Sequence, residues 1–225
     1  MKPSVLLATT TTPDGATLTL HRRDGHYHLR VGGLGLMSTT ATGSEMQLAQ
    51  AACERLGAVA GGRVLIGGLG LGFTLRRVLE LAPADVEVQV AELMPEVVAW
   101  NREHLRDVNG GLLDDPRVEV LVADVVEVVT DAAPDSWDAV IIDVDNGPFA
   151  LVDHGSGRLY GVPGLRAVAR ALRPGGRAVF WSAAPDPAFM RRLAAAGFRA
   201  TAIAARAYPT AKRRSHTLFV ADRQR

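Results

Sequence analysis

An apolar segment that runs directly into three alternating glycines constrains the fold of this chain more than any other feature. In the stretch VLIGGLGLGF, residues 64–73, Gly68, Gly70 and Gly72 alternate with two leucines. Glycine adopts backbone conformations that side chains exclude, and it lets another group approach the peptide closely. The segment therefore predicts a strand, a tight turn and a helix start whose free N–H groups bind an extended nucleotide or nucleoside. A buried tight turn without a ligand is the alternative.

Apolar strands and amphipathic helices alternate from this segment to the C-terminus. Five strands are predicted in RVLIGG, VEVQVAEL, RVEVLVAD, DAVIIDVD and RAVFWSA, and a final pair in RATAIAARAY and HTLFVADR. Strands that are apolar on both faces are typical of a buried parallel sheet. We therefore predict an α/β fold with a Rossmann-like, doubly wound, mainly parallel seven-stranded sheet that ends in a C-terminal antiparallel hairpin.

The N-terminal part has the pattern of a small β segment. Two alternating stretches, residues 17–22 and 26–31, flank Asp24-Gly25, which is a strong hairpin-turn signal. A helix is predicted next, in SEMQLAQAACERLG. We expect an N-terminal β-hairpin segment over residues 1–42 and the Rossmann-like domain over residues 43–225.

Composition excludes several classes of function. The 225 residues carry a formal net charge of +1, so bulk electrostatics imply no polyanionic partner, and the basic stretch AKRRSH is interpreted as a solvated turn rather than a nucleic-acid contact. The one cysteine, Cys53, allows no intrachain disulfide. No stretch approaches the ~20 apolar residues of a membrane span, and the histidines lack metal-ligand spacing. We expect a cytoplasmic protein without a metal or a membrane partner.

Three acidic residues follow successive predicted strands. Glu92, Asp124 and Asp143 end the segments VQVAE, LVAD and VIID. The carboxyl ends of parallel strands form the ligand crevice of an open α/β sheet, so these side chains should converge on one cleft. An acid placed as Glu92 is can accept hydrogen bonds from ribose hydroxyls. Solvated loop acids or helix caps are the alternative interpretation.

Residues 61–222 resemble the class I S-adenosylmethionine-dependent methyltransferase superfamily in the order of their motifs. The matching features are the glycine loop, Glu92, Asp124 and the LRPGG stretch at residues 172–176. The resemblance implies that the loop passes the methionine part of S-adenosylmethionine, that Glu92 holds the ribose and that Asp124 lies beside the adenine amine.

Within that superfamily the chain is most similar to spermidine synthases and the bacterial spermidine synthase-like group. The stretches SEMQLA, DDPRVEVLVAD and DAVIIDVDNGP resemble motifs of those enzymes, which places Glu45 and Asp143 on two of their acids. Those enzymes transfer an aminopropyl group from decarboxylated S-adenosylmethionine to a diamine. The resemblance also implies a homodimer formed through the N-terminal β segment.

Two departures fall on the chemistry. Gly70 stands where those enzymes carry an aspartate that helps to hold the donor, and Asn146 stands where they carry the acid that takes the amine proton. An amide has no basic site near neutral pH. Asp145 could substitute only with a shifted backbone. Asp143, Asp145 and Asn146 are the catalytic candidates.

Two aromatic residues complete the predicted site. Tyr160 lies beyond the loop that follows Asp143, and Trp181 ends a strand at the edge of the cleft. Together with Glu45 they are the candidates for binding a small-molecule acceptor. We weigh three functions: methyl transfer from S-adenosylmethionine, which the two departures favour; aminopropyl transfer from the decarboxylated donor; and non-catalytic binding of an adenosyl ligand.

Overall fold

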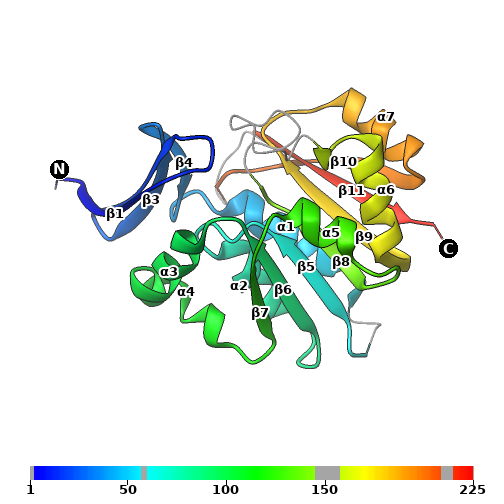
Figure 1. Ribbon diagram of the computed structural model, residues 1–225, viewed down its shortest axis with the longest axis horizontal. Helices are drawn as coiled ribbons and strands as arrows, with labels where there is room; N and C mark the ends of the chain where they lie inside the picture. Colours follow the sequence, from blue (N-terminus) through cyan, green and yellow to red (C-terminus); the bar gives the residue numbers. More distant parts are fainter. Residues whose placement is uncertain (1–2, 57–59, 145–157, 209–214, 225) are drawn as a thin grey trace.

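The computed structural model describes residues 3–56, 60–144, 158–208 and 215–224, and it contains two sheets (Figure 1). The small N-terminal sheet is antiparallel, with its strands in the order β1-β2-β3-β4. These strands are β1 Val5–Thr11, β2 Thr17–Arg23, β3 His26–Val31 and β4 Leu34–Ser38. The large sheet has seven strands in the order β10-β11-β9-β8-β5-β6-β7.

The large sheet alternates with helices along the chain. Its strands are β5 Arg63–Gly67, β6 Glu87–Glu92, β7 Val118–Val122, β8 Trp137–Ile142, β9 Leu172–Ser182, β10 Phe198–Ala205 and β11 His216–Arg223. The helices are α1 Gly43–Cys53, α2 Phe73–Leu81, α3 Pro95–Glu103, α4 Arg106–Asn109, the 3₁₀ turn η2 Leu112–Asp114, α5 Val125–Asp131, α6 Val162–Ala171 and α7 Pro187–Ala195.

The strand pairing confirms the predicted fold class. β5 pairs in parallel with both β6 and β8, and β7 and β9 extend the parallel sheet on either side. β11 is antiparallel to β9 and to β10, as predicted for the C-terminal hairpin. The chain order reverses between β5 and β8, which is the place where open α/β sheets bind ligands.

Alternating side chains on the strands build a core on each face of the large sheet. Ile66 of β5 packs in the cluster that contains α1, α2 and α3, whereas its neighbour Leu65 packs in the cluster with α5, α6 and α7. Both residues are fully buried. This two-sided burial explains why the strand is apolar from Val64 onward.

The N-terminal segment differs from the predicted two-stranded hairpin by two added strands. The Asp24-Gly25 turn is present, with φ of +50° and +80° at its two central residues, as a hairpin turn of this kind requires. β1 and β4 flank the hairpin; their threonine-rich and glycine-containing sequences lack the alternation that marks β2 and β3. The boundary at residue 42 and the homodimer stay predictions.

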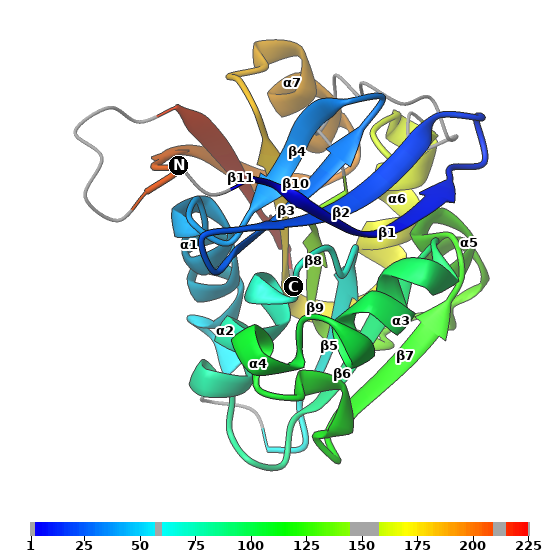
Figure 2. The same ribbon diagram turned by 90° about the vertical axis from the view of Figure 1, so that its left-hand side faces the viewer.

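The small sheet lies beyond one end of the large sheet (Figure 2) and shares its core. Leu18, Leu20 and Leu29 belong to the same apolar cluster as α1 and α2. No helix in the described part of the chain is both long enough and apolar enough to cross a membrane.

We predict that the small sheet unfolds together with the large one. Leu20 is fully buried, so Leu20→Ala should lower the free energy of unfolding by about 2–5 kcal/mol. All three tryptophans, Trp100, Trp137 and Trp181, lie outside the small sheet, so their fluorescence in a urea titration reports the large domain. Leu34→Ala, at a side chain that is 69% exposed in the same sheet, is the control. An unchanged tryptophan transition in Leu20→Ala would contradict this coupling.

Candidate active site

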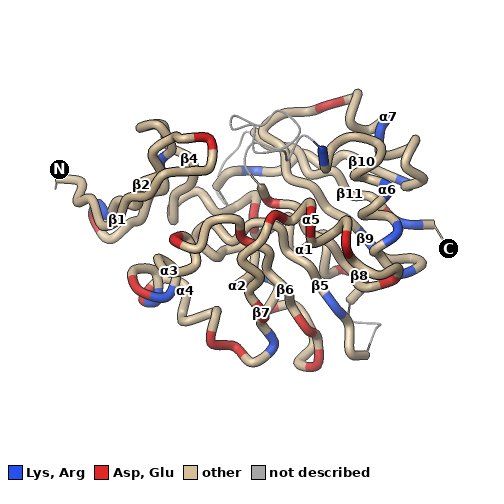
Figure 3. The backbone as a smooth tube through the Cα atoms, viewed as in Figure 1, with Lys and Arg blue, Asp and Glu red and all other residues tan. Residues whose placement is uncertain are grey.

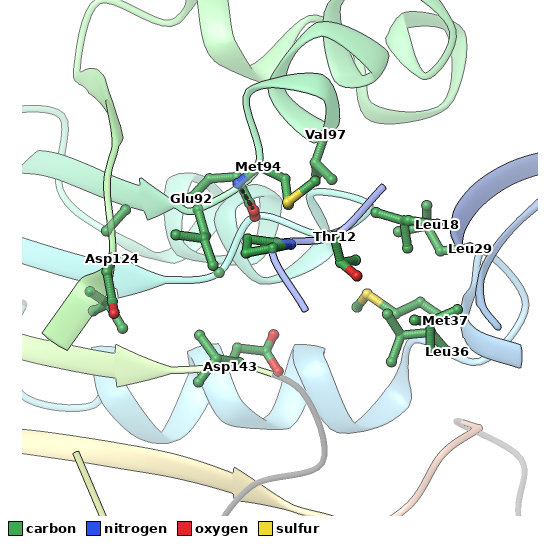
Figure 4. A pocket seen from close by; sticks show the side chains of 18 of the residues that line it. Thr12, Leu18, Leu29, Leu36, Met37, Glu92, Met94, Val97, Asp124 and Asp143 are labelled. Carbon is green, nitrogen blue, oxygen red and sulfur yellow. Dashed lines mark hydrogen bonds between the residues drawn. The ribbon is translucent and has the colours of Figure 1, made fainter. Parts of the chain in front are cut away.

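One cavity lies at the carboxyl ends of β5, β6, β7 and β8, beneath the small sheet (Figure 4). The glycine loop after β5 forms part of it through Gly68 and Gly70. Four carboxylates line it, namely Glu45, Glu92, Asp124 and Asp143. These acids come from α1 and from the ends of three strands, so the predicted convergence of acidic residues on one cleft is present. Figure 3 shows acidic segments gathered at the middle of the molecule.

The three alternating glycines are required first by the chain's own packing. All three have positive φ, between +51° and +92°. A Cβ atom on Gly68 would lie 2.5 Å from the carbonyl oxygen of Asp143, and one on Gly70 would lie 2.6 Å from Sδ of Met37. Gly72 precedes α2 and does not line the cavity. A side chain is therefore excluded at Gly68 and Gly70, because the Asp143 backbone and the Met37 side chain approach the loop closely.

Glu92 holds the glycine loop in place through backbone donors. The backbone N–H of Leu69 donates to one carboxylate oxygen at 2.9 Å, and the N–H of Met94 donates to the other at 2.9 Å. The side chain is 8% exposed and borders the cavity. A carboxylate oxygen can accept more than one hydrogen bond, and the contact of Glu92 with ribose hydroxyls stays a prediction.

Two buried asparagines support the loop from behind, and sequence reasoning missed this role. The Asn101 amide donates to the carbonyl oxygen of Gly70 at 2.8 Å, and Asn109 donates to Asn101 at 2.9 Å. Both side chains are buried. An amide inside the otherwise apolar run VVAWN was the signal that a buried hydrogen-bond partner was needed.

Asp124 combines two of the interpretations weighed from the sequence. Its side chain accepts a hydrogen bond at 2.8 Å from the backbone N–H of Val126, which caps α5. It also borders the cavity. The cap fixes the carboxylate at the end of β7, and the predicted contact with an adenine amine stays a prediction.

Glu45 and Asp143 form a pair of acids with raised pKa values. Burial and then the charge of Asp143 raise the pKa of Glu45 to about 7, against a 2.7 Å hydrogen bond that Ser44 donates. Burial raises the pKa of Asp143 to about 6, although Thr74 donates a 2.6 Å hydrogen bond to it. Two acids that disfavour each other's charge are arranged to receive a cation.

The remaining predicted residues divide between the cavity and other places. Trp181 lines the cavity and packs against the ring of His216, with centroids 4.8 Å apart. Tyr160 lies in the core against Phe180 and Phe189 and is 3% exposed. It is therefore placed away from the described cavity wall. Asp145 and Asn146 fall outside the described residues.

The cavity carries negative charge without a positive counterpart. Among the described residues, its lining includes four carboxylates and no lysine, arginine or histidine. No group of three metal-ligating side chains occurs within the described ranges either. Charge complementarity therefore favours a cationic ligand.

We predict that Gly70→Asp destabilises the protein because the new side chain meets Met37. Overpacking of this kind costs about 1–3 kcal/mol. Asp tolerates the left-handed backbone better than most residues, and Met37→Ala removes the obstructing atoms, so the double variant should be more stable than the sum of the single changes predicts. Urea unfolding of the four proteins gives the coupling.

Gly110→Asp is the matched control, because Gly110 also has positive φ but has nothing within 4 Å of its Cβ position. Gly110→Asp should lower the free energy of unfolding by less than Gly70→Asp does. Strict additivity between positions 37 and 70 would show that the two residues do not compete for space.

We predict that Glu45→Gln stabilises the protein at high pH. The raised pKa means that the folded state keeps a proton which the unfolded state loses between about pH 4.5 and pH 7. Wild-type stability therefore falls through that window, and the variant escapes the loss, by about 1–3 kcal/mol at pH 8. The difference should largely vanish at pH 4.5.

Thermal unfolding at both pH values measures this, with Glu103→Gln, at an exposed side chain on α3, as the control. Equal effects of Glu45→Gln at the two pH values would contradict the raised pKa.

Curated relatives of this chain are polyamine aminopropyltransferases. The protein of that name from Mycobacterium tuberculosis (strain CDC 1551 / Oshkosh) is 40% identical over 124 residues, which are 54% of this chain and 23% of that protein. Polyamine aminopropyltransferase 2 from Pseudomonas aeruginosa is 40% identical over 117 residues, 50% of this chain and 31% of that protein. The matches thus span less than a third of the length of either relative.

Solved structures of similar fold cover nearly the whole chain. The crystal structure of spermidine synthase from Thermotoga maritima has a TM-score of 0.74 at 21% identity, and covers 97% of this chain and 72% of that one. A probable spermidine synthase from Corynebacterium glutamicum has a TM-score of 0.69 at 17% identity, and covers 99% and 81%. At these identities the likeness shows the fold.

The comparisons correct one prediction. The preference for methyl transfer from S-adenosylmethionine is wrong, because the curated relatives carry the name of the alternative, aminopropyl transfer. That preference relied on the residues at positions 70 and 146. The loss of a carboxylate at Gly70 is explained by Met37, which fills the space, and four other carboxylates still line the cavity.

A family model agrees with the predicted resemblance. It is described as Spermine/spermidine synthase domain, and it matches residues 53–195. The matched segment is more than half of the chain, and it contains the glycine loop, Glu92, Asp124 and Asp143. The chain belongs to the spermine/spermidine synthase domain family.

Proposed function

We propose that this protein transfers an aminopropyl group from decarboxylated S-adenosylmethionine to a small amine. The observation that carries the proposal is the cavity lining, which among the described residues contains four carboxylates and no cationic side chain. The methionine tail of S-adenosylmethionine ends in a carboxylate, which would meet like charge there. The decarboxylated tail ends in an ammonium group alone, which the acids attract.

The adenosyl part of the donor is assigned to the loop and the strand ends. Glu92 would hold the ribose, and Asp124 would lie beside the adenine amine. Both side chains are fixed by backbone N–H groups before any ligand arrives. Such preorganisation reduces the ordering that binding requires.

The donor's sulfonium activates the neighbouring carbon: the amine nitrogen forms the new C–N bond as the C–S bond breaks, and the electron pair of the broken bond stays on sulfur. The protein's part is to align the amine and to remove its proton. Asp143, with a pKa near 6, is matched to accept that proton near neutral pH. Glu45 beside it would hold the ammonium of the donor tail.

We predict that the protein releases methylthioadenosine from the decarboxylated donor when amines are supplied, and that it releases none from S-adenosylmethionine. Asp143→Asn should lower kcat/KM by ~100-fold or more, because an amide cannot accept the proton. Chromatography with mass detection measures methylthioadenosine and the aminopropylated amine.

Asp107→Asn makes the same chemical change at an exposed side chain of α4 and should leave the rate unchanged. If neither donor bound in calorimetry and no amine gave product, the proposed function would be refuted.

A further inference from the structure

The geometry points to an acceptor that is a primary amine on an apolar body, such as an alkylamine or arylalkylamine, rather than a diamine or polyamine. This inference rests on the proposed aminopropyl transfer and names its substrate class. The inference is based on the wall of the cavity that the small sheet forms.

Five apolar side chains of the small sheet form this wall, which we call the apolar wall. They are Leu18, Leu29, Val31, Leu36 and Met37. Leu18 and Leu29 are 5% and 3% exposed, so their positions are fixed by core packing. Figure 4 shows Leu18, Leu29, Leu36 and Met37 on the opposite side of the cavity from Asp124. Apart from Thr12, the end of the cavity away from Asp124 is thus apolar.

Met37 also removes the carboxylate that a residue at position 70 could supply. Its Sδ and Cε atoms would lie 2.6 and 2.9 Å from a Cβ on Gly70. A thioether therefore occupies the space above the glycine loop. A thioether packs well against alkyl and aromatic groups and gives no counter-charge to an ammonium.

Two of the four carboxylates in the described lining are already held by backbone donors. Glu92 accepts two backbone N–H groups, and Asp124 caps α5. Glu45 and Asp143 remain, one for the donor ammonium and one for the amine that attacks. A second ammonium on a diamine would extend toward the apolar wall, where the described lining supplies the Thr12 hydroxyl but no carboxylate.

Burying that second charge against the wall is costly, whereas burying a methyl or phenyl group there is favourable. The reaction itself is unchanged: the neutral amine nitrogen forms the C–N bond, the C–S bond breaks with its electrons on sulfur, and the proton passes to Asp143. The two classes of acceptor differ in their far end, which is an ammonium group in a diamine and a methyl or phenyl group in the proposed acceptor.

Hexylamine and 1,5-diaminopentane test the inference because they have equal numbers of heavy atoms and differ in one terminal group. With the decarboxylated donor, hexylamine should show a kcat/KM at least ~10-fold higher than the diamine, measured by methylthioadenosine release. Putrescine and spermidine should be no better than the diamine, and phenethylamine should resemble hexylamine.

Met37→Glu adds a carboxylate to the apolar wall and should reduce the preference for hexylamine ~10-fold. Met37→Gln is the matched control of equal size without charge, and it should keep most of the preference. Met37 is partly exposed, and thermal unfolding verifies that both variants fold.

A wild-type preference for the diamine or for putrescine overturns the acceptor inference and leaves aminopropyl transfer standing. An equal effect of Met37→Glu and Met37→Gln also overturns it, because the wall would then act by shape alone. If no amine in the series causes release of methylthioadenosine, the proposed function itself is refuted.

Discussion

The glycine loop is hydrogen-bonded to the strand on each side of it, and the geometry of the cavity depends on this attachment. The N–H of Gly68 donates to the carbonyl of Ala91 at the end of β6, and the N–H of Asp143 donates to Gly67 at the end of β5. Glu92 adds its bond to Leu69. Because backbone groups make the first two bonds, the carboxylates at the ends of β6 and β8 are placed by the sheet itself.

Most of the fold could be predicted from local pattern. The buried strand around Ile66 is apolar on both faces, and Asp24-Gly25 supplies the positive φ values of a hairpin turn. The convergence of Glu92, Asp124 and Asp143 followed from strand order alone. Such features depend on neighbours in sequence or on a general rule of topology, so a single chain reveals them.

Contacts between distant segments could not be predicted in this way. Met37 lies 33 positions before Gly70, and nothing in the sequence of either segment indicates that they touch. The same holds for Asn101, whose amide reaches the Gly70 carbonyl from the helix after the next strand. The preference for methyl transfer failed for a related reason. The residue at a single position does not determine the charge of a cavity, which is a property of all the side chains that meet there.

The acid pair links stability to ligand choice. Burial raises the pKa values of both Glu45 and Asp143, and the charge of Asp143 raises the pKa of Glu45 further. A cation between them would remove much of that repulsion and return the pKa values toward the ordinary range, with release of a proton. A neutral or anionic ligand would bring no such gain. The unfavourable burial of these two carboxylates at neutral pH therefore favours binding of a cationic ligand, and discrimination between donor tails follows from the same two carboxylates.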